Sequence, residues 1–483
     1  MKENGVMMQY FEWYLNHEPH LWVRLQQDAS HLKNIGITAV WLPPAFKGIG
    51  SIYDVGYGVY DLYDLGEFNQ KGTICTKYGT KDEYLKAIDA LHQQGIDVYA
   101  DIVLNHKMGA DKNEYVKAHE VNQKNKNEVI GQEQMIEVST LFTFPGRHQK
   151  YSDFVWDWTC FSGIDYDILS KRHATFLFKD KHWNQFVDEE NGNFDYLMGA
   201  DIDFSQSKVV AELEKWGKWY FDITHVDGLR LDAVKHIDAH FYRDWLAQMR
   251  KYQEKDFFVV GEYWHGDVKR LLEYLHMVDE KMSLFDVPLH YHFYEVSYAQ
   301  GHYDMSKILE GTLVEKAPHL AVTFVDNHDT QPSQGLQSWV ADWFKPLAYA
   351  LILLRQDGYP CLFYGDYYGI QGKRNSTLKQ KIEQLLWLRQ QCATGEQRDY
   401  FDDPDIIGWI RRGKLLHGLA CIMSDQVGGY KDMLMGKEYA GCVMKDALGN
   451  CSHEVVIDQD GFGHFYVEGS SVSVYICYDQ VSK

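Results

Sequence analysis

Three acidic side chains stand at the ends of separate apolar runs, where a catalytic group could be placed. Asp232 lies two residues after Arg230 in GLRLDAVKH. Glu262 follows four apolar residues and a glycine in FFVVGEYW, and Asp329 ends the run LAVTFVDNHD. Residues two apart in a strand point to the same side, so the guanidinium of Arg230 can keep Asp232 ionised.

These carboxyl groups suit the hydrolysis of a glycosidic bond. An ionised carboxylate can attack the sugar, and a protonated carboxyl group can give its proton to the leaving oxygen. Asp232 fits the first role. Glu262 fits the second, because Trp264 beside it would shield it from water and desolvation raises the pKa of a carboxyl group. Asp329 could orient sugar hydroxyls and favour a distorted ring.

A regular alternation predicts the elements that would bring these acids together. Between Met1 and about Ala393, eight apolar runs alternate with amphipathic stretches, which is typical of βα units around a parallel sheet. Two of the stretches end at Gly36 and Gly95, which suit the C′ position of a helix. Eight units close a (β/α)₈ TIM barrel, whose active site lies at the carboxyl ends of the strands. The runs begin at Gly5, Ile37, Ile96, Val226, Phe257, Ser283, Leu320 and Tyr359.

Each acid also has a plainer interpretation, as a solvated loop residue or as the partner of a structural arginine. Three acids at predicted strand ends, all at the same end of one barrel, favour the catalytic interpretation.

Two segments interrupt the alternation and predict further domains. Roughly 100 residues separate the third run, which ends at His106, from a helix-like stretch at Lys208, and a connection of that length is expected to form a domain. The segment lacks helical periodicity, so we expect an irregular β-rich insertion. After Ala393, short alternating runs predict a small antiparallel β-domain. The expected division is a barrel over 1–104 and 208–394, an insertion over 105–207 and a C-terminal domain over 395–483.

Composition excludes some classes of partner. The formal net charge of -21 argues against nucleic acid and anionic lipid, which both need a cationic surface. No apolar run reaches the roughly 18 residues of a membrane span. No P-loop is present and no GxGxxG follows a strand, so a nucleotide cofactor is poorly supported. The aromatic share of 15% suits a protein that holds sugar faces, although large cores use aromatic residues too. The oligomeric state stays open.

The N-terminal segment and the cysteines bear on localisation. MKENGVMMQYFEWY has no apolar h-region and no small-residue cleavage site, so no signal peptide is predicted. Eight cysteines are scattered singly without a CxxC pair, which indicates reduced thiols. We therefore expect a cytoplasmic protein, or a secreted one if a leader precedes this sequence.

Four motifs give the sequence a specific resemblance. NHKMGAD, GLRLDAVKHI, GEYW and FVDNHDTQ resemble, in order and spacing, the successive conserved blocks of the α-amylase family, glycoside hydrolase family thirteen. The likeness extends from Met8 to GSSVSVYI near the C-terminus, and is greatest to bacterial liquefying and cytoplasmic α-amylases. It implies a (β/α)₈ barrel with an insertion after the third strand and a C-terminal β-sandwich. It also implies retaining endo-hydrolysis of α-1,4-glucosidic bonds in starch, glycogen or maltodextrin.

The resemblance assigns a role to each motif residue. Asp232 would be the nucleophile, Glu262 the acid/base and Asp329 the transition-state stabiliser. The substrate-binding residues would be His106, Arg230, His236 and His328 around the central subsite, Trp13 and Tyr57 on its sugar-contacting wall, and Lys235 and Trp264 on the leaving-group side.

The resemblance also implies calcium between the barrel and the insertion. Asn105, Asp195, Asp201 and the backbone oxygen of His236 would be the ligands, and oxygen atoms are what Ca²⁺ prefers. The two aspartates could instead make ordinary turn hydrogen bonds.

Additional metals are expected to be fewer than in the liquefying enzymes. Those enzymes extend the site into a row of metals with acids where this chain has Ser162, Asn184 and Ser205, and Asp203 alone cannot replace the lost charge. We therefore expect a single calcium there. A further calcium could lie between the barrel and the C-terminal domain, held by Asp405, Asp425 and the backbone oxygens of Gly301 and Tyr303.

Two alternatives to an α-amylase remain. A transglycosylase or an α-1,6-acting relative would keep the same carboxyl groups, because only the acceptor or the linkage differs. A non-catalytic carbohydrate-binding protein is disfavoured because all three acids are present. The natural substrate among starch, glycogen and maltodextrin is left open.

Overall fold

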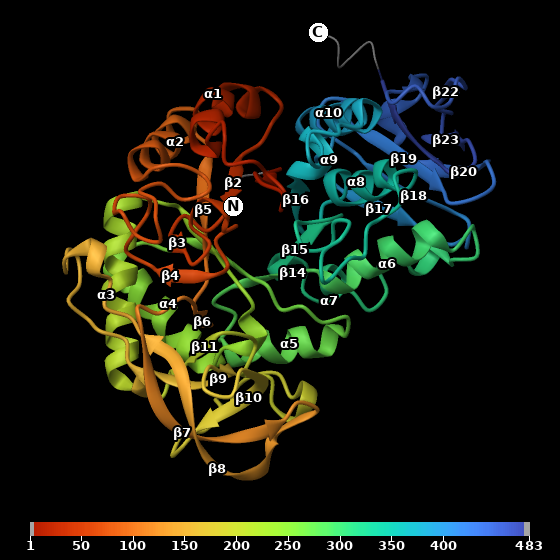
Figure 1. Cartoon of the computed structure of the whole chain (residues 1–483). Coiled ribbons are helices and arrows are strands. Elements are labelled where there is room, and N and C mark those ends of the chain that lie inside the picture. The colour runs from red at the N-terminus through yellow and green to blue at the C-terminus, as the bar shows by residue number, and fades with distance from the viewer. Residues whose placement is uncertain (1–3, 478–483) are drawn as a thin grey trace.

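A closed barrel of eight parallel strands forms the centre of the computed structural model, which describes residues 4–477 (Figure 1). Each of the eight predicted apolar runs contains one of these strands, so the predicted (β/α)₈ fold is confirmed. Pairing of Met7 with Cys361 closes the ring. In order around the barrel, the strands are β1 (Met7–Gln9), β2 (Ala39–Leu42), β5 (Asp97–Ile102), β12 (Gly228–Leu231), β13 (Phe258–Gly261), β14 (Ser283–Phe285), β15 (Ala321–Phe324) and β16 (Tyr359–Phe363).

Helices follow most of the strands and carry the predicted end signals. Gly36 and Gly95 directly follow the C-cap residues of the first two helices, with φ of +93° and +68°, which a residue with a Cβ atom rarely adopts. Among residues 4–477, no helix is long and apolar enough to cross a membrane. The helices are α1 (Leu21–Asn34), α2 (Lys81–Gln93), α3 (Ser207–Thr224), α4 (Ala239–Gln253), α5 (Val268–Met277), α6 (Val287–Tyr298), α7 (Leu313–Lys316), α8 (Lys345–Leu354), α9 (Tyr364–Tyr368) and α10 (Ser376–Gln391).

The long segment after β5 forms an antiparallel sheet of six strands, in the order β6-β11-β9-β10-β7-β8. Its long hairpin is at the lower edge of Figure 1. Pairing of Asp201 with His106 joins this sheet to the segment that leaves the carboxyl end of β5. The insertion therefore starts at the barrel face where an active site is expected. Its strands are β6 (His106–Lys107), β7 (Lys112–Asn122), β8 (Asn125–Leu141), β9 (Phe161–Asp167), β10 (Arg172–Phe178) and β11 (Ala200–Ile202), and a separate small pair joins β3 (Lys47–Gly48) to β4 (Val59–Asp61).

The C-terminal part is antiparallel, as predicted, and lies on another side of the barrel (Figure 1). One sheet has the order β17-β18-β19-β24-β21-β22, and a second consists of β20 and β23. Buried Ile422, Met433 and Phe465 belong to their common core. The strands are β17 (Gln397–Tyr400), β18 (Ile406–Arg411), β19 (Leu419–Ser424), β20 (Gly429–Leu434), β21 (Val443–Asp446), β22 (Val455–Val456), β23 (Phe462–Val467) and β24 (Ser471–Ile476).

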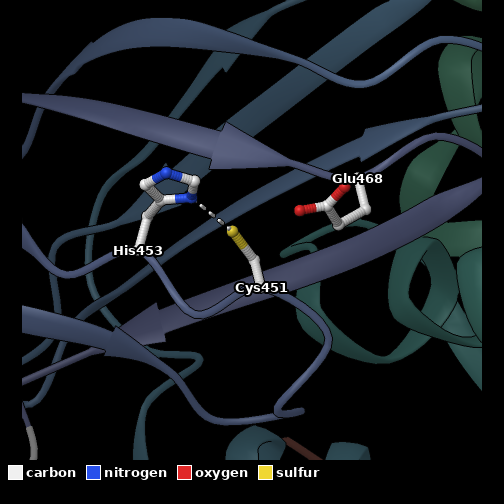
Figure 2. A group of neighbouring side chains, drawn as sticks. All are labelled: Cys451, His453 and Glu468. Atoms are coloured by element: carbon white, nitrogen blue, oxygen red, sulfur yellow. Dashed lines mark hydrogen bonds between the residues drawn. The ribbon is translucent and has the colours of Figure 1, made fainter.

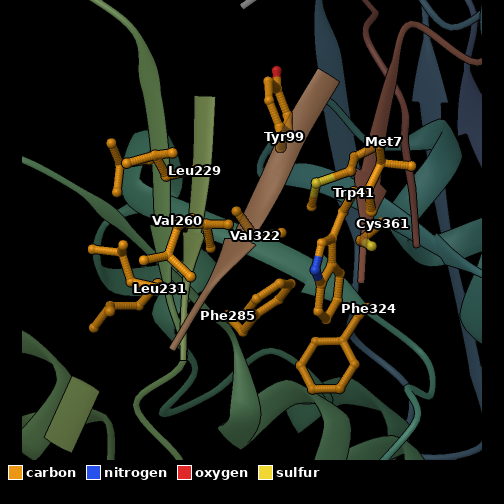
Figure 3. Packing of buried hydrophobic residues seen from close by; sticks show 14 of the residues in the cluster. Met7, Trp41, Tyr99, Leu229, Leu231, Val260, Phe285, Val322, Phe324 and Cys361 are labelled. Atoms are coloured by element: carbon orange, nitrogen blue, oxygen red, sulfur yellow. The ribbon is translucent and has the colours of Figure 1, made fainter. Parts of the chain in front are cut away.

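Aromatic side chains form an apolar layer inside the barrel (Figure 3). The ring centroids of Trp41 and Phe285 are 5.3 Å apart, and those of Phe285 and Phe324 are 5.7 Å apart. The guanidinium carbon of Arg230 lies 4.9 Å from the Trp41 ring. Polar groups at the strand ends therefore rest on a layer that excludes water, which strengthens electrostatic interactions between them.

Candidate active site

Arg230 is the centre of a buried polar cluster at the carboxyl ends of the strands. The side chain lies on β12 and is fully buried. One guanidinium nitrogen donates to Asp232 at 2.6 Å and to Asp101 at 2.9 Å, and the other donates to Glu262. Arg230 and Asp232 share a face of the strand, as the spacing of two predicts. Carboxyl groups from three neighbouring strand ends thus converge on one cation.

Asp101 belongs to this cluster but was not identified from the sequence. It lies opposite Arg230 in the register of β5 and β12. Its Oδ2 accepts hydrogen bonds from the Trp41 indole at 3.0 Å and from the Tyr57 hydroxyl at 2.9 Å. The signal that could have found it is an acid at an inward position of the apolar run IDVYADIVLNH. Asp101 positions the arginine and two aromatic rings at once.

Glu262 is buried directly after β13, as its apolar neighbours led us to expect. Burial, opposed by Arg230 and assisted by the charges of Asp232 and Asp329, raises the pKa of Glu262 to about 8. The N–H of Ala233 also donates to its Oε2 at 3.3 Å. Glu262 therefore holds a proton at neutral pH although it contacts a guanidinium group.

Asp329 keeps partial access to solvent, with 24% of its side chain exposed. Burial by the surrounding residues raises the pKa of Asp329 to about 7. Its Oδ2 lies 3.2 Å from Nε2 of His328, whose Nδ1 faces the amide nitrogen of Gln9 at 2.9 Å. Because that amide donates to Nδ1, the proton of the neutral imidazole sits on Nε2. Burial lowers the pKa of His328, so the ring is neutral.

Three flat rings form a stack next to the cluster. The Tyr57 ring lies parallel to His328, with centroids 5.2 Å apart, and parallel to Trp13 at 6.0 Å. His106 is buried, and its Nε2 contacts the Tyr57 carbonyl oxygen at 2.8 Å. A flat aromatic surface beside polar groups can hold the apolar face of a sugar ring.

The remaining predicted substrate residues face other parts of the molecule. Lys235 donates to Glu190 of the insertion at 3.0 Å, and Nδ1 of His236 contacts the Phe194 carbonyl oxygen at 2.6 Å. The Trp264 indole donates to the Tyr291 hydroxyl at 2.9 Å. Lys235 and His236 thus lie at the junction with the insertion, in the turn that follows Asp232.

Buried acids form a second polar group at this junction. Asn105, Asp195 and Asp201 are each about 1% exposed, and Oδ2 of Asp201 has no hydrogen-bond partner. Asn184 donates to Asp195 through its backbone and side-chain nitrogens, at 2.9 and 2.8 Å. Burial and repulsion from Asp195 and Asp203 raise the pKa of Asp201 well above its usual range. This group of oxygens is suited to hold a hard cation.

Comparisons with known proteins identify the family of this chain. A family model described as the alpha amylase catalytic domain matches residues 25–404, and an alpha-amylase C-terminal model matches residues 423–476. An alpha-amylase of Geobacillus stearothermophilus is 53% identical over 478 residues, covering 98% of this chain and 87% of that protein. The cytoplasmic alpha-amylase of Escherichia coli is 44% identical, covering 98% and 99%. A solved Anoxybacillus α-amylase structure shares the fold at 17% identity, with a TM-score of 0.67 and 98% coverage of both chains. The chain therefore belongs to the α-amylase family of glycoside hydrolases.

Proposed function

We propose that this enzyme hydrolyses internal α-1,4-glucosidic bonds of starch, glycogen or maltodextrin with retention of the anomeric configuration. The observation that carries the proposal is the attachment of Asp232 and Glu262 to the two terminal nitrogens of one buried guanidinium group. A retaining glycosidase needs two such carboxyl groups close together, one ionised and one protonated.

In the first step, Glu262 gives its proton to the oxygen of the bond that breaks. Asp232 attacks the anomeric carbon, the sugar–oxygen bond breaks, and a covalent glycosyl-enzyme forms. The charge-assisted hydrogen bond from Arg230 holds the Asp232 carboxylate in position for this attack. The raised pKa of Glu262 keeps the required proton in place at neutral pH.

In the second step, the ionised Glu262 removes a proton from water, which attacks the same carbon and releases Asp232. Two inversions give net retention. The guanidinium group of Arg230 balances the charge that appears on Glu262 between the steps. Asp329, which keeps partial access to solvent beside His328, would bind sugar hydroxyls while the ring is distorted.

Product analysis tests the proposal and separates it from its alternatives. Maltoheptaose and soluble starch are digested, and the products are separated by chromatography over time. Mixed oligosaccharides at early times support endo-attack on α-1,4 bonds. One dominant product indicates an exo-acting enzyme, products longer than the substrate indicate a transglycosylase, and cleavage confined to branch points indicates an α-1,6-acting relative.

We also propose that Ca²⁺ binds Asn105, Asp195, Asp201 and the backbone oxygen of His236. The unpartnered Oδ2 of Asp201, buried among other acids, supports this assignment because such a group is costly unless a cation compensates it. Bound calcium would fix the insertion against the turn that carries Lys235 and His236. Its role is to hold the substrate cleft in shape.

A row of metals beyond this calcium is not expected, and one contact supports that expectation. The ammonium group of Lys181 lies 2.6 Å from Asp203 and 2.6 Å from the Thr159 carbonyl oxygen. The ammonium group of Lys181 thus takes the place beside Asp203 that a metal ion would need. Ser205 and Asn184 add only neutral groups, so little negative charge remains for a second ion.

A second calcium between the barrel and the C-terminal domain is supported by Asp425. Both of its carboxylate oxygens are buried without a hydrogen-bond partner. Burial and repulsion from Asp405 raise the pKa of Asp425 to about 6. Asp405 and the backbone oxygens of Gly301 and Tyr303 would complete the ligand set.

We propose a cytoplasmic location, supported by the similarity to the cytoplasmic enzyme of Escherichia coli and by the lack of disulfide bonds in the described part of the chain. Cell fractionation with antibody detection tests this; recovery of the protein in the culture medium would contradict it.

A further inference from the structure

A cysteine, a histidine and a glutamate meet in the C-terminal domain, remote in sequence from the catalytic acids. Cys451 and His453 lie in the loop between β21 and β22, and Glu468 directly follows β23. One ligand atom from each residue lies within 4.8 Å of the others. Figure 2 shows the cysteine sulfur between the imidazole and the carboxylate. None of these residues contributes to the catalytic cluster or to the proposed calcium ligands.

The loop that carries Cys451 is held rigidly by the carboxylate of Asp446. That carboxylate accepts hydrogen bonds from the backbone N–H groups of Leu448 at 3.0 Å, Asn450 at 2.7 Å and Cys451 at 2.9 Å. It also accepts one from Val474 on β24 at 2.8 Å. The backbone that carries the thiol is therefore fixed before any ligand binds.

A neighbouring aromatic ring orients the imidazole group. The His453 ring stacks on Tyr466 with centroids 4.5 Å apart and an angle of 22° between the planes. Nδ1 of His453 faces the Cys451 sulfur at 3.4 Å. Cys451 is buried and forms no disulfide, whereas His453 and Glu468 are exposed. The thiol closes the inner side of the group, and the outer side is open to solvent, so a small ion can enter.

We propose that Cys451, His453 and Glu468 bind a thiophilic divalent cation of the Zn²⁺ class, with water as the fourth ligand. Thiolate, imidazole and carboxylate are the ligands that tetrahedral zinc takes, whereas calcium takes oxygen alone. Zinc bonds of about 2.3 Å to sulfur and about 2.0 Å to nitrogen separate these two atoms by about 3.5 Å in a tetrahedron. The observed 3.4 Å matches this edge. On binding, the thiol proton of Cys451 passes to solvent, so affinity rises with pH.

Such an ion would join parts of the domain that the backbone connects only indirectly. It would tie the loop between β21 and β22 to the turn between β23 and β24. The same loop contacts the barrel, because Lys381 of α10 donates to the Leu448 carbonyl oxygen and to Asn450. The expected effect is stabilisation of the C-terminal domain and of its contact with the barrel, since a ligand that binds only the folded state stabilises it.

Cobalt and zinc binding to the full-length protein tests the site, with calcium present in excess so that the oxygen sites are filled. Addition of Co²⁺ should give the near-ultraviolet absorption of a cobalt–thiolate bond. Competition with a chromophoric chelator should show one Zn²⁺ per chain. C451S and H453A should each lower zinc affinity by more than about 100-fold, because even an outer-shell partner costs about 10–100-fold. Zinc should raise the unfolding temperature of the wild type and not of C451S.

Two matched variants control for general effects. C442S removes a partly buried thiol from the same domain, and H464A removes an imidazole that also packs on Tyr466, at 4.8 Å. Both should keep the wild-type affinity. E468Q keeps the shape of its side chain and should weaken binding, which provides a test even if C451S or H453A does not fold.

Three results would overturn the proposal. Absence of the thiolate band in the wild type at saturating Co²⁺ would show that the sulfur binds no metal. Persistence of the band in folded C451S would assign it to another cysteine. Unchanged zinc affinity in E468Q would show that Glu468 is not a ligand, which would overturn the three-residue site.

Discussion

Arg230 binds Asp232 through one guanidinium nitrogen and Glu262 through the other. The planar fork fixes the separation of the two carboxyl groups, which a flexible lysine would not do. In the proposed mechanism, the same guanidinium group also serves both states of the catalytic cycle. While Glu262 is protonated, Arg230 is balanced by Asp232 and Asp101; when Glu262 loses its proton, the same cation stabilises the new charge.

Replacement of either catalytic carboxyl group by an amide should abolish activity without unfolding the protein. We expect Asp232→Asn and Glu262→Gln each to retain the side-chain shape and lose at least about 10²–10⁴-fold in kcat, the usual contribution of general acid catalysis. Turnover of soluble starch and circular dichroism of each variant are the measurements. A folded variant that keeps more than a tenth of wild-type turnover would contradict the assigned role.

Freshly released oligosaccharides should carry the α configuration. Two successive inversions, one by Asp232 and one by water, return the anomeric carbon to its starting geometry. Proton NMR during the first minutes of hydrolysis, before mutarotation, distinguishes the two anomers. Initial appearance of the β-anomer would rule out a covalent intermediate on Asp232.

Activity should fall on the alkaline side as Glu262 loses its proton. Burial raises the pKa of Glu262 to about 8, so the acid form persists through neutral pH and is lost above it. We therefore expect kcat/KM to decline as pH rises through about 8, since this parameter reports the free enzyme. Fluorescence at each pH checks that the enzyme stays folded. A decline centred below pH 6 would mean that Glu262 is not the group that limits activity.

Asp101, which is fully buried, should be required for stability. In Asp101→Asn, the amide presents a donor where the Trp41 indole and the Tyr57 hydroxyl both donate to Oδ2. An unsatisfied buried donor costs about 1–3 kcal/mol, and urea denaturation measures this loss. Tyr57→Phe removes one donor and serves as the control, with a smaller effect expected. Equal stability of Asp101→Asn and the wild type would show that the hydrogen bonds from Trp41 and Tyr57 to Asp101 do not stabilise the fold.

How far the sequence predicts this molecule depends on whether a contact is local or long-range. The apolar runs predict the eight strands because burial on both faces demands continuous apolar residues. Spacing along one strand predicts that Arg230 and Asp232 share a face. The contact of Arg230 with Glu262 and the place of Asp101 depend on register between strands, which no local pattern encodes. For the same reason the approach of Glu468 to Cys451 is visible only in the folded chain.

The last prediction concerns calcium in the insertion. Asp201 carries a buried carboxylate oxygen without a hydrogen-bond partner, so its charge destabilises the protein unless a cation binds. In calcium, wild type should be more stable than Asp201→Asn, because it binds the ion only when folded. In EDTA the order should reverse, since the amide removes the uncompensated charge and keeps the shape.

Thermal unfolding of both proteins, with and without calcium, measures this reversal in the order of stability. Asp425→Asn, which alters the proposed C-terminal site, is the control. In this background, Asp201→Asn should still lower stability in calcium and raise it in EDTA. Anomalous scattering can then locate each ion. We expect one calcium beside Asp201 and none beside Asp203, where the Lys181 ammonium group already supplies a positive charge 2.6 Å away. A full row of metals there would show that neutral ligands and water suffice, and an empty site beside Asp201 at saturating calcium would overturn the assignment.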